Sequence, residues 1–178
     1  MSLHRIFITG AIVAGAFVSQ AMAFDFGRPA TSDEIKLWDI DVRPDGKGLP
    51  EGSGTAAHGK AVYDDNCAAC HGASGQDGIK DRLVGGQGSL ASDKPVKTVG
   101  SFWPYATTLF DYIHRAMPYP APGSLSDDDT YAVTAYILNL NGIVPVDAKL
   151  DKDALPRIKM PNRDGFIPEP EFSGKTKK

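Results

Sequence analysis

Residues 67–71 read CAACH and hold both cysteines of the chain, Cys67 and Cys70, followed directly by His71. A redox-active C-x-x-C pair usually opens a helix after a strand, and no strand pattern precedes Cys67. A zinc site needs four ligands, and the other histidines lack finger-like spacing. C-x-x-C-H is the attachment signature of c-type haem, in which both thiols bond the porphyrin and the next imidazole ligates the iron. We therefore predict one covalently bound haem c on Cys67, Cys70 and His71.

The start of the 178-residue chain has the form of an export signal. A short basic start precedes an apolar run over residues 6–18, and Ala21-Met22-Ala23 forms an A-x-A cleavage site. The run is too short to span a bilayer comfortably, so an uncleaved anchor is the less favoured alternative. We predict a signal peptide over 1–23, a mature chain from about Phe24 and export to a compartment where haem c attachment is expected.

The charge of the mature chain excludes one class of partner. Removing the signal takes away Arg5 and no acidic residue, so the net charge becomes −4 instead of −3 with neutral histidines. This mild acidity argues against nucleic acid as a partner and gives no sign of a membrane-surface role. No later segment is apolar enough to span a membrane, so we expect none that does.

Two extended segments flank the central part of the chain. Residues 24–54, rich in Gly, Pro and Asp, predict an N-terminal arm with a short helical turn near Thr31. Its apolar patch over 35–38, IKLW, favours contact with another surface over disorder. Residues 145–178 predict a C-terminal tail that lies along the domain or a partner and then frays at its basic end, KTKK.

Residues 55–144 carry the helix patterns and predict one domain. Thr55 can cap a first helix that runs to about Asp65. A glycine-rich loop over 72–100 follows, and a loop of this length is uncommon in a compact domain unless it wraps something. Ser126 caps a last helix that is apolar on nearly every side, so this helix should be covered on more than one face.

The middle helix ends at the candidate second iron ligand. Residues 102–116, FWPYATTLFDYIHRA, predict this helix with Pro104 in its first turn. Its expected apolar face consists of Tyr105, Leu109, Tyr112, Ile113 and Ala116. Met117 precedes Pro118, which favours an extended backbone and should stop the helix. The prolines that follow stiffen the loop, so little entropy is lost when it holds a thioether on iron. We predict Met117 as the sixth ligand; the alternatives are Met160, His58, His114 and water.

Other residues around CAACH resemble those of class I cytochromes c. Gly59 and Tyr63 precede Cys67 by eight and four residues, and Tyr136 lies in the last helix. In class I cytochromes c the first and last helices cross at a glycine with aromatic side chains around it. The alternative is an ordinary helical glycine that costs about 1 kcal/mol relative to alanine. The resemblance implies an all-α fold, with three main helices around one haem c and extended arms at both ends.

The expected ligands and their surroundings point to electron transfer. His/Met ligation raises the reduction potential and closes both axial positions, which favours outer-sphere transfer of one electron. Arg82, Trp103 and Tyr105 are candidate hydrogen-bond donors to the haem propionates, which need neutralising if buried. A surface arginine and two core aromatics are the alternative interpretation of these three residues.

Longer runs narrow the interpretation further. Residues 41–72, 98–143 and 157–166 resemble the cytochrome subunit of sulfur-oxidising dehydrogenases of the Sox type, commonly called SoxD. The resemblance implies a periplasmic location and a molybdenum-cofactor subunit that oxidises sulfane sulfur or sulfite and donates its electrons to this chain. It also implies axial ligation by His71 and Met117. Electrons would leave to a downstream cytochrome c or an oxidase.

The resemblance has one departure. Some members of that family carry two haem domains, whereas this chain has a single C-x-x-C-H motif, so we expect it to hold one electron at a time. We expect an electron-transfer subunit that is not catalytic by itself, held in a stable heteromer. The alternatives are a freely diffusing shuttle cytochrome and a haem enzyme with a labile sixth site.

Overall fold

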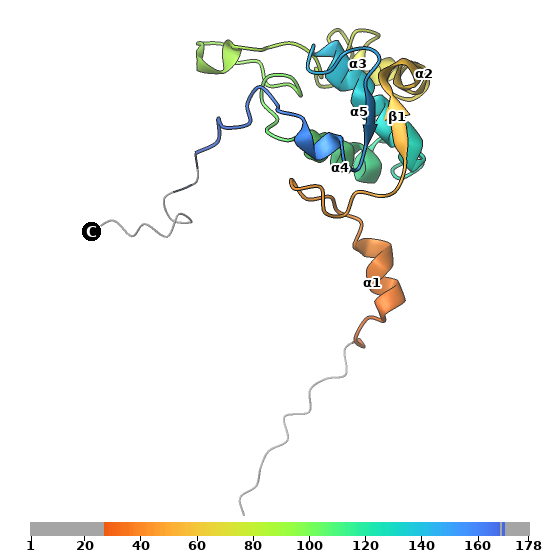
Figure 1. The fold of residues 1–178 in the computed structure, drawn as a ribbon. Coiled ribbons are helices and arrows are strands. Elements are labelled where there is room, and N and C mark those ends of the chain that lie inside the picture. Colours follow the sequence, from red (N-terminus) through yellow and green to blue (C-terminus); the bar gives the residue numbers. More distant parts are fainter. Residues whose placement is uncertain (1–26, 168, 170–178) are drawn as a thin grey trace, which may run out of the picture.

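The computed structural model describes residues 27–167 and 169, and the predicted signal peptide and the basic end KTKK lie outside them. Its α-helices are α1 (Ser32–Trp38), α2 (Ala56–Asn66), α3 (Ala68–His71), α4 (Ala106–Ala116) and α5 (Asp127–Leu140). Two short 3-10 helices, η1 (Ser89–Ala91) and η2 (Leu155–Arg157), and two strands, β1 (Ser53–Thr55) and β2 (Lys149–Asp151), complete it. The expectation of a mainly helical fold is confirmed (Figure 1). Among the described helices, none is long and apolar enough to cross a membrane.

Helices α2 and α5 cross at Gly59. A Cβ added to Gly59 would overlap the backbone carbonyl of Ala132 on α5, so the two backbones are as close as they can be. Tyr63 on α2 and Tyr136 on α5 pack beside this contact, with ring centroids 5.3 Å apart. The crossing expected from Gly59, Tyr63 and Tyr136 is confirmed, and the glycine serves close approach rather than flexibility.

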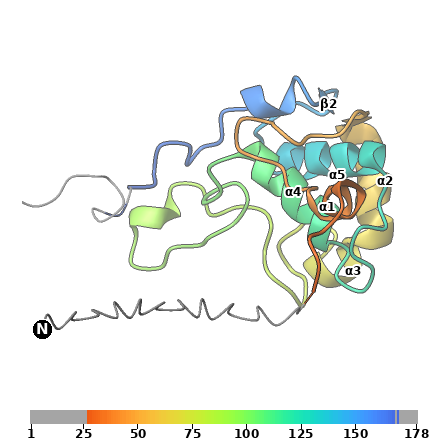
Figure 2. The same ribbon diagram turned by 90° about the horizontal axis from the view of Figure 1, so that it is seen from below.

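The last helix, α5, is buried on several faces. Tyr131, Ala132 and Val133 are fully buried, and α5 packs against α2, α4, β1 and β2 (Figures 1 and 2). The apolar character of this helix therefore reflects cover by the chain itself. Its start is capped as predicted, because the Ser126 hydroxyl accepts the backbone N–H of Asp129 at 3.1 Å. Thr55 caps α2 in the same way through the N–H of His58.

Helix α4 differs from its prediction at its start and in its apolar face. Tyr105 has an extended backbone, with φ −137° and ψ 134°, so α4 begins at Ala106 and Pro104 lies before its first turn. Phe110 is fully buried and packs on Tyr131 at 4.4 Å between centroids, whereas Tyr112 is 48% exposed. The core face is thus turned toward Phe110, because Tyr131 on α5 offers a partner that periodicity along α4 cannot reveal.

The C-terminal tail lies along the domain, as expected. Strand β2 pairs antiparallel with β1, with Gly54 opposite Leu150. Leu150, Leu155 and Met160 are all buried in the common core. This small sheet was not predicted from the sequence, because a three-residue strand is too short to show an alternating pattern.

Residues 42–54 of the N-terminal arm are held on the domain, for example by hydrogen bonds to the carbonyls of Pro44 and Pro50, and the hydrogen bond nearest to α1 is made at Val42. The backbone N–H of Val42 donates to the buried carboxylate of Asp111 on α4 at 2.8 Å. Arg115 donates to the same carboxylate, with its Nε at 2.8 Å. Beyond this point α1 projects away from the domain and buries none of its side chains (Figure 1). The predicted helical turn near Thr31 is confirmed, but α1 does not lie on its own domain.

Opposing effects act on the pKa of Asp111. Burial raises this pKa, and hydrogen bonds from Arg115 and Val42 lower it more, so the net direction is downward. A carboxyl whose folded pKa is depressed stabilises the fold above its unfolded pKa of about 3.9 and loses that contribution as the pH falls through the folded value. Asp111 should therefore stabilise the fold fully at neutral pH.

Replacing Gly59 should weaken the helix crossing. We expect Gly59→Ala to lower the free energy of unfolding by roughly 1–3 kcal/mol, because the added methyl group forces the two backbones apart. Urea denaturation of the purified holoprotein measures this. At exposed Ala61 on the same helix, the control Ala61→Gly should cost only about 0.5–1 kcal/mol through helix propensity. A Gly59→Ala variant as stable as the wild type would contradict the proposed contact.

Replacing Asp111 should lower the stability of the fold at neutral pH and have less effect in acid. We expect Asp111→Asn to lower the free energy of unfolding by roughly 2 kcal/mol at pH 7, because charged hydrogen bonds to Val42 and Arg115 are lost. The difference from the wild type should shrink as the pH is lowered below about 4, where the wild-type carboxyl also becomes protonated. Denaturation at pH 7 and pH 3 tests this. Asp64→Asn, which breaks the exposed pair with Lys60, should cost about 0.5 kcal/mol or less.

Candidate haem-attachment site

The CAACH segment forms a single tight turn at the end of α2. Cys67 donates its N–H to the carbonyl of Tyr63 at 2.8 Å, which closes α2, and its own carbonyl accepts the N–H of His71 at 2.9 Å. The short helix α3 then carries Cys70 and His71. Both cysteines are free thiols and half-buried. One turn of backbone therefore presents two thiols and an imidazole at the predicted attachment site.

The loop after the turn packs directly on it. Lys80 donates its N–H to the carbonyl of Cys70 at 2.9 Å, and the Tyr63 hydroxyl donates to the carbonyl of Gly72 at 2.8 Å. A Cβ at Gly78 would overlap that same Cys70 carbonyl, so only glycine fits there. Burial raises the pKa of Tyr63 to about 12, which keeps its hydroxyl a hydrogen-bond donor. The packing holds the turn rigid, and sequence reasoning did not identify Gly78.

The imidazole of His71 is oriented by a main-chain carbonyl. Its Nδ1 lies 2.7 Å from the carbonyl oxygen of Asp81, which can only accept, so Nδ1 carries the proton. The other ring nitrogen, Nε2, is therefore the one that can act as a metal ligand. Sequence reasoning missed this contact, because any residue type at position 81 supplies a carbonyl.

The environment of Cys67 does not suit a redox-active dithiol. Burial, followed by the nearby Cys70, raises the pKa of the Cys67 thiol to about 11. Catalytic dithiols need the opposite shift, since the thiolate is the nucleophile. Among the described residues, no group of three or more His, Cys, Asp or Glu side chains is arranged as metal ligands.

The backbone of Met117 is held by the end of α4. Met117 ends α4 with an extended conformation, φ −122° and ψ 147°, and its N–H donates to Ile113 at 3.0 Å. The stop before Pro118 is thereby confirmed. Its side chain is half-buried against the core. The loop from Met117 to Ser126 is pinned across its ends, because His114 Nε2 lies 3.2 Å from the Asp127 carboxylate.

The other candidates for the sixth ligand have different surroundings. His58 is exposed, and its Nε2 lies 2.9 Å from the Asp129 carboxylate. His114 stacks on Phe110 in addition to its contact with Asp127. Met160 is 1% exposed and packed in the core. Met117 is thus the candidate whose side chain is neither paired with a carboxylate nor enclosed in the core.

The three candidate propionate donors lie in two places. Trp103 packs edge-on against Tyr112 with centroids 5.8 Å apart, and the ring of Tyr105 lies 4.1 Å from the guanidinium of Arg163. Both precede α4 and are half-buried. Arg82 is exposed and follows Asp81, the residue that orients His71. In the part of the chain that the structure describes, no hydrogen bond joins Arg82 to either aromatic residue, so the predicted role of these three toward propionates stays a prediction.

The residues present fit a haem c. Cys67, Leu83 and Met117 are partly buried and pack against the hydrophobic core. The site supplies two free thiols, an imidazole oriented through its Nδ1 and a confined thioether. These are the donor types that haem c attachment and His/Met ligation use.

Comparisons with known proteins agree with this donor set. The family model described as cytochrome c matches residues 56–141. A chain in the crystal structure of the sulfane dehydrogenase SoxCD from Paracoccus pantotrophus is 44% identical, with a TM-score of 0.76; the similarity covers 87% of this chain and 80% of that one. Thiosulfate dehydrogenase from Psychrobacter arcticus is 29% identical over 116 residues, or 63% of this chain.

The two similarities differ in extent. The matched part of the thiosulfate dehydrogenase is 35% of its length, so the chain spans about a third of that protein. The SoxCD chain, in contrast, is matched over most of its length, which confirms the predicted resemblance to SoxD. With the helix crossing, the CAACH turn and the family match together, the chain belongs to the cytochrome c family and is a SoxD-like electron carrier.

Proposed function

We propose that this protein is a periplasmic monohaem cytochrome c that accepts single electrons from a molybdenum-dependent sulfane or sulfite dehydrogenase subunit. The observation that carries the proposal is the bond from His71 Nδ1 to the Asp81 carbonyl, within one turn of the two free thiols. It leaves Nε2 free to ligate iron. The haem, when bound, supplies reversible one-electron chemistry.

The residues of the protein would attach the haem, orient it and enclose it. Cys67 and Cys70 would hold the porphyrin covalently, and His71 and Met117 would ligate the iron. A haem held by both residues would offer substrate and O₂ no free position, so the chemistry it would supply is the transfer of electrons. The hydrogen bond that His71 Nδ1 donates to the Asp81 carbonyl increases the basicity of the imidazole and fixes its ring.

The proposed donor follows from the SoxCD similarity at 44% identity over most of both chains. Oxidation of sulfite to sulfate releases two electrons, as does each addition of a water-derived oxygen atom to sulfane sulfur, and a chain with one C-x-x-C-H motif holds one electron at a time. Two successive transfers are therefore needed in each turnover, with the first electron passed to a downstream cytochrome c or oxidase before the second arrives. The periplasmic location is proposed from the export signal.

Replacing Met117 tests the sixth ligand. We expect Met117→Ala to abolish the weak red absorption band that ferric haem shows with a methionine ligand, and to lower the reduction potential. Spectra and potentiometry of the purified ferric protein measure both. Met160→Leu is the matched control: this buried methionine should be replaceable with the band retained. Retention of the band in Met117→Ala would reject Met117 as the ligand.

Complex formation tests the donor. Co-expressed with the molybdenum-cofactor dehydrogenase subunit of the same organism, the cytochrome should co-elute in size-exclusion chromatography at micromolar concentration. Sulfite or a sulfane substrate should then reduce its haem. Separate elution with slow reduction would favour a freely diffusing shuttle cytochrome. Binding of CO to the reduced wild type would instead indicate a labile sixth site and a haem enzyme.

A further inference from the structure

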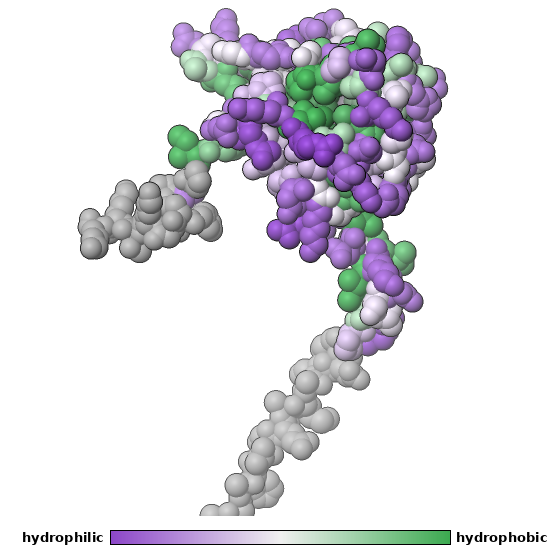
Figure 3. All heavy atoms as spheres, viewed as in Figure 1, coloured by the Kyte–Doolittle hydropathy of each residue, from purple (hydrophilic) through white to green (hydrophobic). Residues whose placement is uncertain are grey.

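The arm over residues 27–41 leaves a set of large apolar side chains in solvent. Trp38 is 86% exposed and Leu37 is 75% exposed, and Ile35 and Ile40 are also exposed. Figure 3 shows apolar atoms of α1 standing clear of the domain. Large exposed apolar side chains gathered on one short segment among charged residues are typical of an interaction surface.

Helix α1 is built to form without the domain. Thr31 and Glu34 make a capping box, and Arg28 donates to both oxygens of the Glu34 carboxylate. A seven-residue helix is marginal in water, and these local contacts stabilise it although none of its side chains is buried on the domain. An ordered arm loses less entropy on binding than a disordered one.

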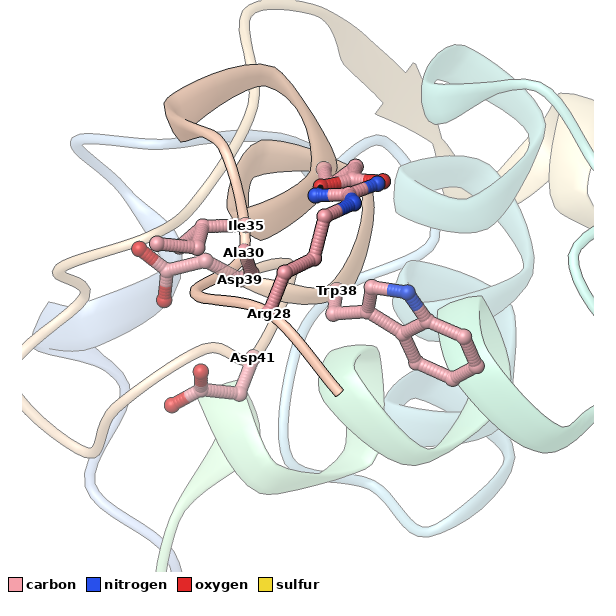
Figure 4. A pocket seen from close by; sticks show the side chains of 7 residues that line it. Arg28, Ala30, Ile35, Trp38, Asp39 and Asp41 are labelled. Carbon is pink, nitrogen blue, oxygen red and sulfur yellow. Dashed lines mark hydrogen bonds and ion pairs between the residues drawn. The ribbon is translucent and has the colours of Figure 1, made fainter. Parts of the chain in front are cut away.

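The arm also forms an open groove of its own. Figure 4 shows Arg28 in the middle of this groove, with Ile35 and Trp38 on its two sides and Asp39 and Asp41 at its edge. Glu34 is paired with Arg28, and Asp33 with Lys36. Among the described residues, Asp39 and Asp41 form no ion pair with a Lys, Arg or His side chain. The surface therefore presents apolar side chains beside two unpaired carboxylates.

The charge of the arm selects among occupants. Residues 27–41 carry two basic and four acidic side chains, a net charge of −2. A second copy of the chain would bring a like-charged arm, and an anionic membrane surface would repel it. An apolar groove with basic residues at its rim complements the arm in both respects.

We propose that the arm around α1 docks the cytochrome on its electron-donating partner, with Trp38 and Leu37 inserted in an apolar groove and Asp39 and Asp41 facing Lys or Arg at its rim. This inference rests on the proposed function. It assigns the arm, rather than the haem-bearing face alone, to complex formation.

Two variants of the mature holoprotein test the apolar and the charged parts. The double variant Leu37→Ala with Trp38→Ala should raise the Kd for the purified molybdenum-cofactor subunit ~10-fold or more, because large buried anchors dominate binding. Asp39→Asn with Asp41→Asn should weaken binding less and make it less dependent on salt. Ile167→Ala, 92% exposed on the C-terminal segment, is the control and should leave the Kd unchanged. Haem spectrum and reduction potential should be the same in all four proteins.

The outcomes separate the two proposals. If the wild type does not bind the subunit, the proposed function fails and this inference fails with it. If the wild type binds and the arm variants bind equally well, only the arm is rejected. A wild-type dimer that Trp38→Ala disrupts would overturn the inference in favour of a second copy, and Trp38-dependent binding to phosphatidylglycerol vesicles would overturn it in favour of a membrane.

Discussion

The approach of α2 to α5 at Gly59 is the contact on which the rest of the structure depends. Helix α2 runs directly into the CAACH turn, and α5 begins where the methionine loop ends. Because helices are rigid and cross at one fixed point, the crossing determines how the His71 side of the site faces the Met117 side. Gly54 adds to it, since its own missing Cβ also lets β1 lie on Ala132. The close contacts of Gly54 and Gly59 with Ala132 thus fix how β1 and α2 lie against α5.

The long loop between α3 and α4 is held in place by the end of α5. The side chain of Asn141 accepts the N–H of Gly85 and donates to the carbonyl of Leu83. It thus satisfies backbone groups of the loop that no secondary structure pairs. Thr98 and Ser101 hydrogen-bond each other and nearby backbone in its buried part. The protein therefore orders this loop with its own polar groups, which explains how a segment with so little regular structure can line a site.

Local signals in the sequence predicted much of this structure, and distant contacts account for what they missed. Thr55 and Ser126 act on backbone groups three residues away, and Pro118 acts on its neighbour, so the helix ends could be predicted. Phe110 owes its burial to Tyr131 on another helix, and Asp111 is satisfied by the distant Val42. At the site, the donor residues could be predicted from their type and spacing. The contact of His71 with the Asp81 carbonyl could not be predicted, because every residue type has a main-chain carbonyl.

The bond between Val42 and Asp111 also sets the reach of the arm. Val42 lies four positions after Trp38, and a fully extended chain spans at most about 14 Å over that length. A surface bound by Trp38 therefore stays within a short distance of α4, the helix that ends at Met117. A tether this short would maintain a high effective concentration of the bound surface near the domain, so that repeated transfers need no new diffusional search. In the proposed one-electron carrier, this would shorten the interval between successive electrons.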